Sequence, residues 1–246
     1  MDAEHRSGIV PRPADAPHLL PARDAYDRAA STYDAWGWQA FWRRNEAPLV
    51  VGMARSLGGV RRILDVGTGT GYYVPPLKEL HAQVVGIDVS QGMLDVAWRR
   101  VGRGTALLQG DVRELPFADG EFDLVVCTRV LTHVWNVGAA LSEINRVLRP
   151  GGFLIASDLD GAHNYPYTRL PTNQGKVAVQ TYKRTLAEFT GQARNGGFVD
   201  LHSRVLTAHT VRWIPPRGLL RRIDRSGRTP VGYVALLVRG PGASPT

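Results

Sequence analysis

Short apolar runs alternate with amphipathic segments along most of this chain. The runs predict seven strands, over residues 61–66, 82–88, 105–109, 122–127, 153–157, 198–212 and 232–239. Between them, apolar residues at helical spacing predict helices over 26–36, 47–57, 72–80, 91–101, 137–148 and 185–194. This alternation predicts an α/β fold, with a seven-stranded and mostly parallel sheet, an antiparallel last strand and helices on both faces.

The same pattern divides the chain into an arm and one domain. Residues 1–22 are rich in proline and lack a periodic apolar pattern, so we expect a disordered arm followed by a single domain over 23–246. Within that domain, the helices of 23–57 precede the first strand and form a small helical lid. Residues 158–182 are polar and exceed an ordinary connection in length, which predicts an insertion that shapes a binding site.

The first strand ends in a loop with three alternating glycines, Gly67, Gly69 and Gly71. Glycine permits positive φ and lets a ligand lie against the main chain, and the following helix start offers unpaired N–H groups. A nucleotide-like cofactor is the expected ligand. The dinucleotide pattern G-x-G-x-x-G is not met, because Tyr72 takes its third glycine position. Asp65, two residues before the loop, would repel a pyrophosphate and suit a cationic amino group.

The residues 65–71, Asp-Val-Gly-Thr-Gly-Thr-Gly, resemble the D/E-x-G-x-G-x-G motif of class I S-adenosylmethionine-dependent methyltransferases. Two further segments match the small-molecule type, which includes the ubiquinone and menaquinone methyltransferases: a Y-D-x-x-A-x-x-Y-D pattern over 26–34 and Leu-Arg-Pro-Gly-Gly at 148–152. The resemblance covers about residues 26–157. It implies a Rossmann-like fold, S-adenosyl-L-methionine as cofactor and methyl transfer as the activity.

Two further acids are expected at the cofactor. Asp88 ends the second strand, where a carboxylate matches the vicinal hydroxyls of a ribose, and Ser90 is expected to cap the next helix. By resemblance, Asp111 accepts from the adenine amino group, although an aspartate after a strand is also a common helix cap. The predicted cofactor-binding residues are Tyr33, Asp65, Gly67, Thr68, Gly69, Gly71, Asp88, Val89, Met93, Asp111, Val112 and Cys127. Met93 is expected to lie on the adenine, and Cys127 is interpreted as a small buried residue rather than a nucleophile.

On the acceptor side, His133 follows the fourth strand and is the predicted catalytic base. The alternative is a structural histidine at a helix start. Substrate contacts are expected from Trp36, His163, Tyr165, Tyr167 and Tyr182. Aromatic residues crowd 36–42, either sealing the active site or forming a satellite core, and for Tyr33 packing on the core is the alternative to ligand contact. We expect no metal, because the magnesium-dependent catechol methyltransferases place an acid where this chain has Cys127.

The net charge of +8 comes from 27 Arg against 3 Lys, a skew typical of a GC-rich genome. Six of these arginines, Arg212, Arg217, Arg221, Arg222, Arg225 and Arg228, form a cluster. A solvated face is the simpler interpretation, and a phosphate, an acidic partner or RNA is the alternative. An RNA methyltransferase is therefore a second hypothesis, but the chain shows no added RNA-binding segment. It also lacks the (N/D)-P-P-(Y/F) motif of nucleic-acid amino-methylating enzymes after the fourth strand.

The first hypothesis is methylation of a small-molecule acceptor, at oxygen, nitrogen or carbon, in bacterial natural product biosynthesis. A cofactor-binding scaffold with a repurposed activity is the third hypothesis, and we expect neither a nucleic acid nor a membrane as partner. The sequence contains no apolar run long enough for a bilayer and no signal peptide pattern, and a single cysteine agrees with a reducing compartment. The expected location is the cytoplasm.

Overall fold

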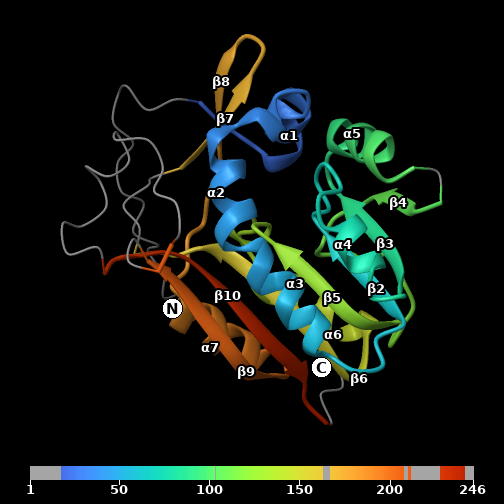
Figure 1. Cartoon of the computed structure of the whole chain (residues 1–246). Helices are drawn as coiled ribbons and strands as arrows, with labels where there is room; N and C mark the ends of the chain where they lie inside the picture. The colour runs from blue at the N-terminus through green and yellow to red at the C-terminus, as the bar shows by residue number, and fades with distance from the viewer. Residues whose placement is uncertain (1–17, 103, 163–166, 208–209, 212–227, 242–246) are drawn as a thin grey trace, which may run out of the picture.

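A computed structural model describes residues 18–102, 104–162, 167–207, 210–211 and 228–241. A seven-stranded sheet with the order β4-β3-β2-β5-β6-β10-β9 forms its centre (Figure 1). The strands are β2 (Arg62–Val66), β3 (Gln83–Asp88), β4 (Ala106–Gln109), β5 (Phe122–Thr128), β6 (Leu148–Leu159), β9 (Phe198–Thr207) and β10 (Pro230–Arg239). β10 is antiparallel to both of its neighbours, and the pairs from β4 to β6 are parallel. The predicted Rossmann-like sheet with an antiparallel last strand is confirmed.

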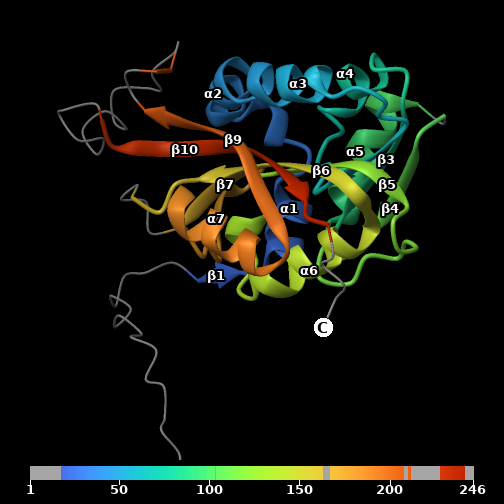
Figure 2. The ribbon, with the colours of Figure 1, turned by 90° about the horizontal axis from the view of Figure 1, so that it is seen from below.

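Helices cover both faces of this sheet (Figure 2). They are α1 (Ala22–Ala29), α2 (Gly37–Asn45), α3 (Ala47–Ser56), α4 (Val74–Lys78), α5 (Gln91–Val101), α6 (Val137–Val147) and α7 (Leu186–Asn195), with 3-10 turns η1 (Tyr33–Ala35) and η2 (Leu131–His133). α3 and α4 pack on one face through residues such as Val50 and Leu77, and α6 and α7 pack on the other through Ile144 and Phe189. Among the described residues, no helix is both long and apolar enough to cross a membrane.

Several expected boundaries differ from the structure. The expected helix over 26–36 begins earlier, at Ala22, and ends at Ala29 before a short turn. The helix expected over 72–80 is only α4, in which Pro75 and Pro76 occupy the first turn as predicted. The strand expected over 153–157 is longer, because β6 already begins at Leu148, and β9 ends at Thr207 rather than at residue 212.

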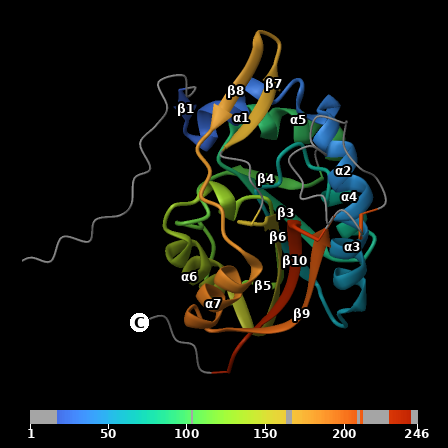
Figure 3. The same cartoon turned by 90° about the vertical axis from the view of Figure 1, so that its left-hand side faces the viewer.

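A second, three-stranded sheet lies above the carboxyl ends of the main strands (Figures 1 and 3). It has the order β1-β8-β7, with β1 (Leu19–Leu20), β7 (Thr168–Thr172) and β8 (Gly175–Val179). The insertion expected over 158–182 thus contains a hairpin. Ordered structure also begins before residue 23, because β1 pairs with Ala178 and Val179 of the hairpin. The rest of the expected arm, residues 1–17, lies outside the described residues, as do the arginine cluster up to Arg225, His163 and Tyr165.

The aromatic segment 36–42 serves two packing roles. Phe41 and Trp42 belong to a satellite core with Leu206 and Val231. Trp36 packs instead with Tyr33 and residues of α1 and the hairpin. One group of aromatic residues therefore attaches this N-terminal segment to the sheet, and another attaches it to the hairpin.

Candidate functional site

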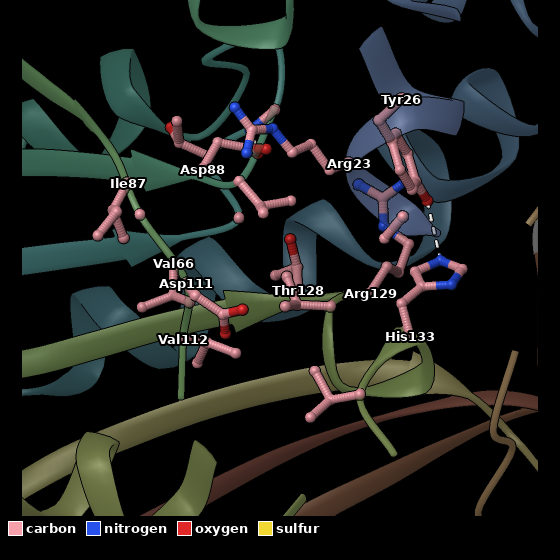
Figure 4. A pocket seen from close by; sticks show the side chains of 18 of the residues that line it. Arg23, Tyr26, Val66, Ile87, Asp88, Asp111, Val112, Thr128, Arg129 and His133 are labelled. Atoms are coloured by element: carbon pink, nitrogen blue, oxygen red, sulfur yellow. Dashed lines mark hydrogen bonds between the residues drawn. The ribbon is translucent and has the colours of Figure 1, made fainter. Parts of the chain in front are cut away.

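A cavity of about 620 Å³ opens at the carboxyl ends of β2, β3, β4 and β5. The glycine loop after β2, the ends of β3 and β5, and helix α1 surround it (Figure 4). In open α/β sheets, ligands bind at this edge where the strand order reverses, and here β2 lies between β3 and β5. The topology therefore places the cavity where a cofactor is expected.

The three loop glycines have different surroundings. All have positive φ, of 65° at Gly67, 53° at Gly69 and 75° at Gly71. A Cβ at Gly67 would lie 2.1 Å from Cγ2 of Val130, whereas a Cβ at Gly69 would meet nothing closer than 3.9 Å. Gly67 and Gly69 line the cavity, but Gly71 packs against Ala97 and Val101 of α5. Gly71 thus has a packing role, and its expected contact with the cofactor stays a prediction.

Asp65 lies beneath this loop and is 1% exposed. Its Oδ2 accepts a hydrogen bond from the Thr68 hydroxyl at 2.7 Å, and its Oδ1 has no hydrogen-bond partner among the described residues. Burial raises the pKa of Asp65 to about 7. Asp65 itself does not line the cavity, but Thr68 does. A buried carboxylate oxygen without a partner fits a cationic group on the other side of the loop.

Asp88 ends β3, lines the cavity and is 8% exposed. Its Oδ2 accepts from the Gly69 amide at 2.8 Å and its Oδ1 from the Ser90 amide at 2.9 Å. Because each carboxylate oxygen has two acceptor sites, both retain one for a diol. Burial raises the pKa of Asp88 to about 6. Val89 also lines the cavity.

The helix after β3 starts as predicted, but Met93 does not reach the cavity. The Ser90 hydroxyl accepts from the Met93 amide at 3.1 Å and caps α5. The Met93 side chain is 1% exposed and does not line the cavity, so the expected contact with an adenine is not supported.

Asp111 and Val112, after β4, line the cavity as expected. Sequence reasoning missed the partner of Asp111, which is Arg113: Nη2 of Arg113 lies 2.6 Å from Oδ2, and Nε lies 3.0 Å from Oδ1. These bonds lower the pKa of Asp111. Arg113 also lines the cavity, so any group that binds there meets a charged pair rather than a lone carboxylate.

Cys127 is fully buried in the core of the sheet and does not line the cavity. Burial raises the pKa of its thiol well above the usual value, which agrees with the interpretation as a small buried residue. Its expected contact with the cofactor stays a prediction, but its side chain faces the core because side chains alternate along a strand. The next residue, Thr128, points into the cavity instead (Figure 4).

His133 and Tyr26 form a half-buried pair on the opposite wall of the cavity (Figure 4). Nδ1 of His133 lies 2.8 Å from the carbonyl oxygen of Gln180, which can only accept, so this nitrogen carries the proton. Nε2 therefore accepts from the Tyr26 hydroxyl at 3.0 Å. Burial lowers the pKa of His133 to about 4 and raises that of Tyr26 well above 10. The imidazole is thus neutral near pH 7, with a fixed tautomer.

A second cavity, of about 200 Å³, adjoins the first. Four residues line both cavities: Tyr26, Tyr33, Arg129 and His133. Trp36 and Tyr167 line the second cavity, whereas Tyr182 lines the first and packs on Trp135. Arg129 could not be identified from the sequence, because the residues that pair with it lie far away in the chain.

Two acids at the end of β6, Asp158 within the strand and Asp160 directly after it, accept hydrogen bonds from backbone amides. Asp158 accepts from the Thr132 amide at 2.6 Å, and Asp160 accepts from the Ala162 amide at 2.9 Å. Within the described ranges, no group of three or more His, Cys, Asp or Glu side chains has the arrangement of a metal site.

The sequence is similar to a methyltransferase family and to individual methyltransferases. A family model described as a methyltransferase domain matches residues 64–156. A demethylmenaquinone methyltransferase from Mycobacterium sp. (strain KMS) is 30% identical over 215 residues, which is 85% of each chain. A malonyl-[acyl-carrier protein] O-methyltransferase from Serratia marcescens is 37% identical over 135 residues, and the match spans 55% of this chain and 51% of that protein.

Among solved structures, a phosphoethanolamine-type N-methyltransferase from Haemonchus contortus, in complex with phosphomonomethylethanolamine and S-adenosylhomocysteine, has a TM-score of 0.68. It is 18% identical, and the match covers 91% of this chain and 61% of that chain. At this identity the likeness concerns the fold.

Proposed function

The chain belongs to the class I S-adenosylmethionine-dependent methyltransferases, and we propose that it transfers the methyl group of that cofactor to a small-molecule acceptor. The observation that carries the proposal is the pair of joined cavities. One is built on the glycine loop and Asp88, and the other adjoins it through Tyr26 and His133. A donor and an acceptor held in the two cavities would meet at these shared side chains.

The residues of the first cavity fit the proposed cofactor. Gly67 and Gly69 line the cavity, and the backbone of Gly69 has open space where a side chain would lie. Asp88 keeps acceptor sites for ribose hydroxyls, and the orphaned oxygen of Asp65 suits an ammonium group. When bound, S-adenosylmethionine supplies a methyl group already activated by the sulfonium. The chain has to align the acceptor and exclude water, and such positioning supplies roughly 7 to 11 kcal/mol of a barrier.

His133 is the proposed base for an acceptor that must lose a proton. Its Nε2 is unprotonated, and its Nδ1 is held by the Gln180 carbonyl, so the ring is oriented toward both cavities. The Tyr26 hydroxyl occupies Nε2 in the ligand-free chain and has to give way to the acceptor. A proton taken from the acceptor would then reside on Nε2 while the acceptor atom gains the methyl group. An amine acceptor can react without this step.

The acceptor is proposed to be a bacterial specialised metabolite or its precursor, and the reaction to occur in the cytoplasm. The helices of 23–57 are the proposed lid, and the hairpin of β7 and β8 is the proposed acceptor-side insertion, since Tyr167, Thr168 and Lys176 line the second cavity. The Mycobacterium relative is a demethylmenaquinone methyltransferase, and the Serratia relative acts on malonyl-[acyl-carrier protein]. Since the chain spans about half the length of the Serratia protein, that protein's substrate is not carried over.

Calorimetry and mass spectrometry test this proposal together. We expect saturable binding of S-adenosylhomocysteine and, with S-adenosylmethionine, the gain of one methylene unit by a compound from a panel of phenols, carboxylic acids and amines. His133→Ala should retain cofactor binding and lose about 100-fold in rate on a phenol or carbon acceptor. His202→Ala, an exposed histidine on β9, is the matched control and should leave both unchanged.

Three outcomes would contradict the proposal in different ways. Absence of cofactor binding overturns the central claim. Cofactor binding without methylation of any compound favours a scaffold with a repurposed activity. Tight RNA binding that weakens steeply with salt, together with methylated RNA, favours the RNA methyltransferase hypothesis.

A further inference from the structure

The second cavity combines aromatic walls with positive charge. Trp36, Trp38, Trp42 and Tyr167 contribute aromatic rings, and Arg129, Arg169, Lys176 and Lys183 contribute cations. Of the described residues that line this cavity, none is an aspartate or a glutamate. Positive charge gathered around a small cavity attracts an anion, and Arg169 and Lys176 add to the charge of Arg129 there.

Arg129 is the cation at the junction with the cofactor cavity. Its side chain is 17% exposed, and its Nε lies 3.2 Å from Oε2 of Glu46, which is fully buried. Nη1 donates to Oε1 of Gln39 at 3.3 Å, and the guanidinium lies over the Trp42 ring at 5.6 Å. Despite its distance from Glu46, the buried Nε makes no hydrogen bond within the described part of the chain, although a guanidinium carries five N–H donors. Part of its hydrogen-bonding capacity is therefore left for a ligand.

The backbone of Arg129 is also unusual. It has a φ of 58°, a conformation that a residue with a long side chain rarely adopts. Its amide donates to the Ser157 carbonyl at 2.7 Å, which holds the strained residue at the end of β5. Strain of this kind is retained where the surroundings fix a side chain in a required direction. Here the direction is toward the two cavities, as Figure 4 shows for the first of them.

The positive charge continues away from the cofactor cavity. Arg169 and Lys176 stand on β7 and β8, are exposed, and line only the second cavity. Arg169 lies over the ring of Tyr167 at 5.1 Å, so its guanidinium is held at the rim. Binding of the cofactor alone would not require cations that line only the second cavity. The distribution of charge therefore favours an anionic group on the acceptor.

Building on the proposed function, we propose that the acceptor is a small aromatic anion, whose carboxylate or equivalent acidic group is bound by Arg129 and attracted by Arg169 and Lys176. The volume of about 200 Å³ is below the roughly 300 to 1,000 Å³ of sites for drug-sized ligands, which restricts the acceptor to one or two rings. The tryptophans supply apolar contact for those rings. Arginine suits this position because its planar fork matches a carboxylate and stacks on an aromatic face.

A matched pair of probes tests the charge requirement. We would titrate 1-naphthoate and the neutral 1-naphthamide into the protein saturated with S-adenosylhomocysteine, and follow tryptophan fluorescence and heat. We expect the acid to bind at least tenfold more tightly than the amide and to weaken with salt. Equal affinities for acid and amide would overturn the proposal. Failure of S-adenosylhomocysteine to bind would instead count against the proposed function, so the two failures are distinguishable.

Variants locate the binding site. Because removal of Arg129 alone leaves Glu46 buried without its partner, the double variant E46Q/R129M is preferred, and it should abolish the preference for the acid. R169Q/K176Q changes exposed residues only. It should weaken the binding of 1-naphthoate about threefold to tenfold without affecting cofactor binding. Arg55 is exposed and pairs with Glu79, so R55M is the control. It should change neither the affinity for 1-naphthoate nor that for the cofactor.

The competing use of Arg129 is binding of the cofactor's own carboxylate. It is tested by comparing S-adenosylhomocysteine with 5′-methylthioadenosine, which lacks that carboxylate. Under our proposal, E46Q/R129M leaves the ratio of their affinities unchanged. A ratio that collapses in this variant, while naphthoate binding persists, would overturn the assignment of Arg129 to the acceptor. If the double variant does not fold, the comparison of acid and amide on the wild-type and R169Q/K176Q proteins decides whether the second cavity prefers an anion.

Discussion

At the scale of single residues, the site depends on carboxyl groups that burial makes hard to ionise. Burial raises the pKa of Asp65 to about 7 and that of Asp88 to about 6, and Oδ1 of Asp65 has no hydrogen-bond partner among the described residues. A ligand with an ammonium group favours the ionised form of Asp65. Cofactor binding should therefore be linked to loss of protons from these acids.

We predict that the affinity for S-adenosylhomocysteine falls as the pH is lowered from 8 to 5.5. Each pH unit below the pKa of a required carboxylate lowers the affinity about tenfold, because the proton has to be removed before binding. Calorimetry across this range measures the effect. Asp65→Asn should bind more weakly at pH 8 and show a flatter profile, since it cannot titrate. A wild-type affinity that is constant between pH 8 and 5.5 would disprove the role of these acids.

The same two acids act in the opposite direction on the ligand-free chain. Their pKa values in the folded state lie above the ordinary value of 3.8, so the folded state binds more protons than the unfolded state between about pH 4 and pH 7. Their contribution to the free energy of unfolding therefore decreases as the pH rises through this window. Ligand binding therefore favours the ionised forms of Asp65 and Asp88, whereas folding favours their protonated forms.

At the scale of elements, the lid is attached to the cofactor loop by the two acids of the repeated Tyr-Asp pattern. Asp27 of α1 accepts from the Ser90 hydroxyl at 2.6 Å and from the Gly92 amide at 2.9 Å, at the start of α5. Asp34 of η1 accepts from the Thr70 hydroxyl at 2.9 Å and pairs with Arg43 and Arg100. The lid therefore contacts both ends of α5 and the glycine loop itself.

We predict that Asp34→Ala loosens the lid. Without the carboxylate, Arg43 and Arg100 repel each other and η1 loses its bond to the loop, so hydrogen exchange of the amides in 22–45 should accelerate. The affinity for S-adenosylhomocysteine should fall roughly threefold to tenfold, as expected for a partly exposed network of ion pairs. Asp119→Ala is the matched control, because it removes an ion pair with Arg146 away from the lid. Identical exchange in both variants would show that Asp34 does not hold the lid.

Elements whose ends are set by neighbouring residues in the sequence could be predicted. Elements that form only when distant segments pair could not. α5 was expected over 91–101 and is found at Gln91–Val101, because Ser90 caps it and its apolar spacing is regular. β1 has only two residues, Leu19 and Leu20, and exists through pairing with β8 about 160 residues later. Arg129 escaped notice for the same reason, since Glu46, Gln39 and Trp42 surround it only after folding.

At the scale of the whole molecule, the cavity joins parts that are otherwise separate packing units. One apolar cluster joins α6 and α7 to the sheet, another joins α3 and α4 to it, and a small one holds α1 to the hairpin of β7 and β8. The first cavity has lining residues from the lid, from β2, β3 and β5, and from the segment after β8. A ligand bound there contacts all of these parts at once and should stabilise the chain as a unit.

This arrangement leads to a prediction about thermal unfolding. A ligand present at 100 times its Kd stabilises the folded state by about 2.7 kcal/mol, and for a chain of this size each kcal/mol raises Tm by about 2–4 °C. S-adenosylhomocysteine at that excess should therefore raise Tm by about 5 to 10 °C in calorimetric scans. NADH should have no effect, because Asp65 disfavours a pyrophosphate and the glycine spacing differs from the dinucleotide pattern.

Asp88→Asn, at the same ligand concentration, should show a smaller shift in Tm than the wild type, whereas Asp119→Ala should show the full shift. If NADH raised Tm as much as S-adenosylhomocysteine does, the loop would be a general nucleotide site, and the selectivity assigned to Asp65 would be wrong.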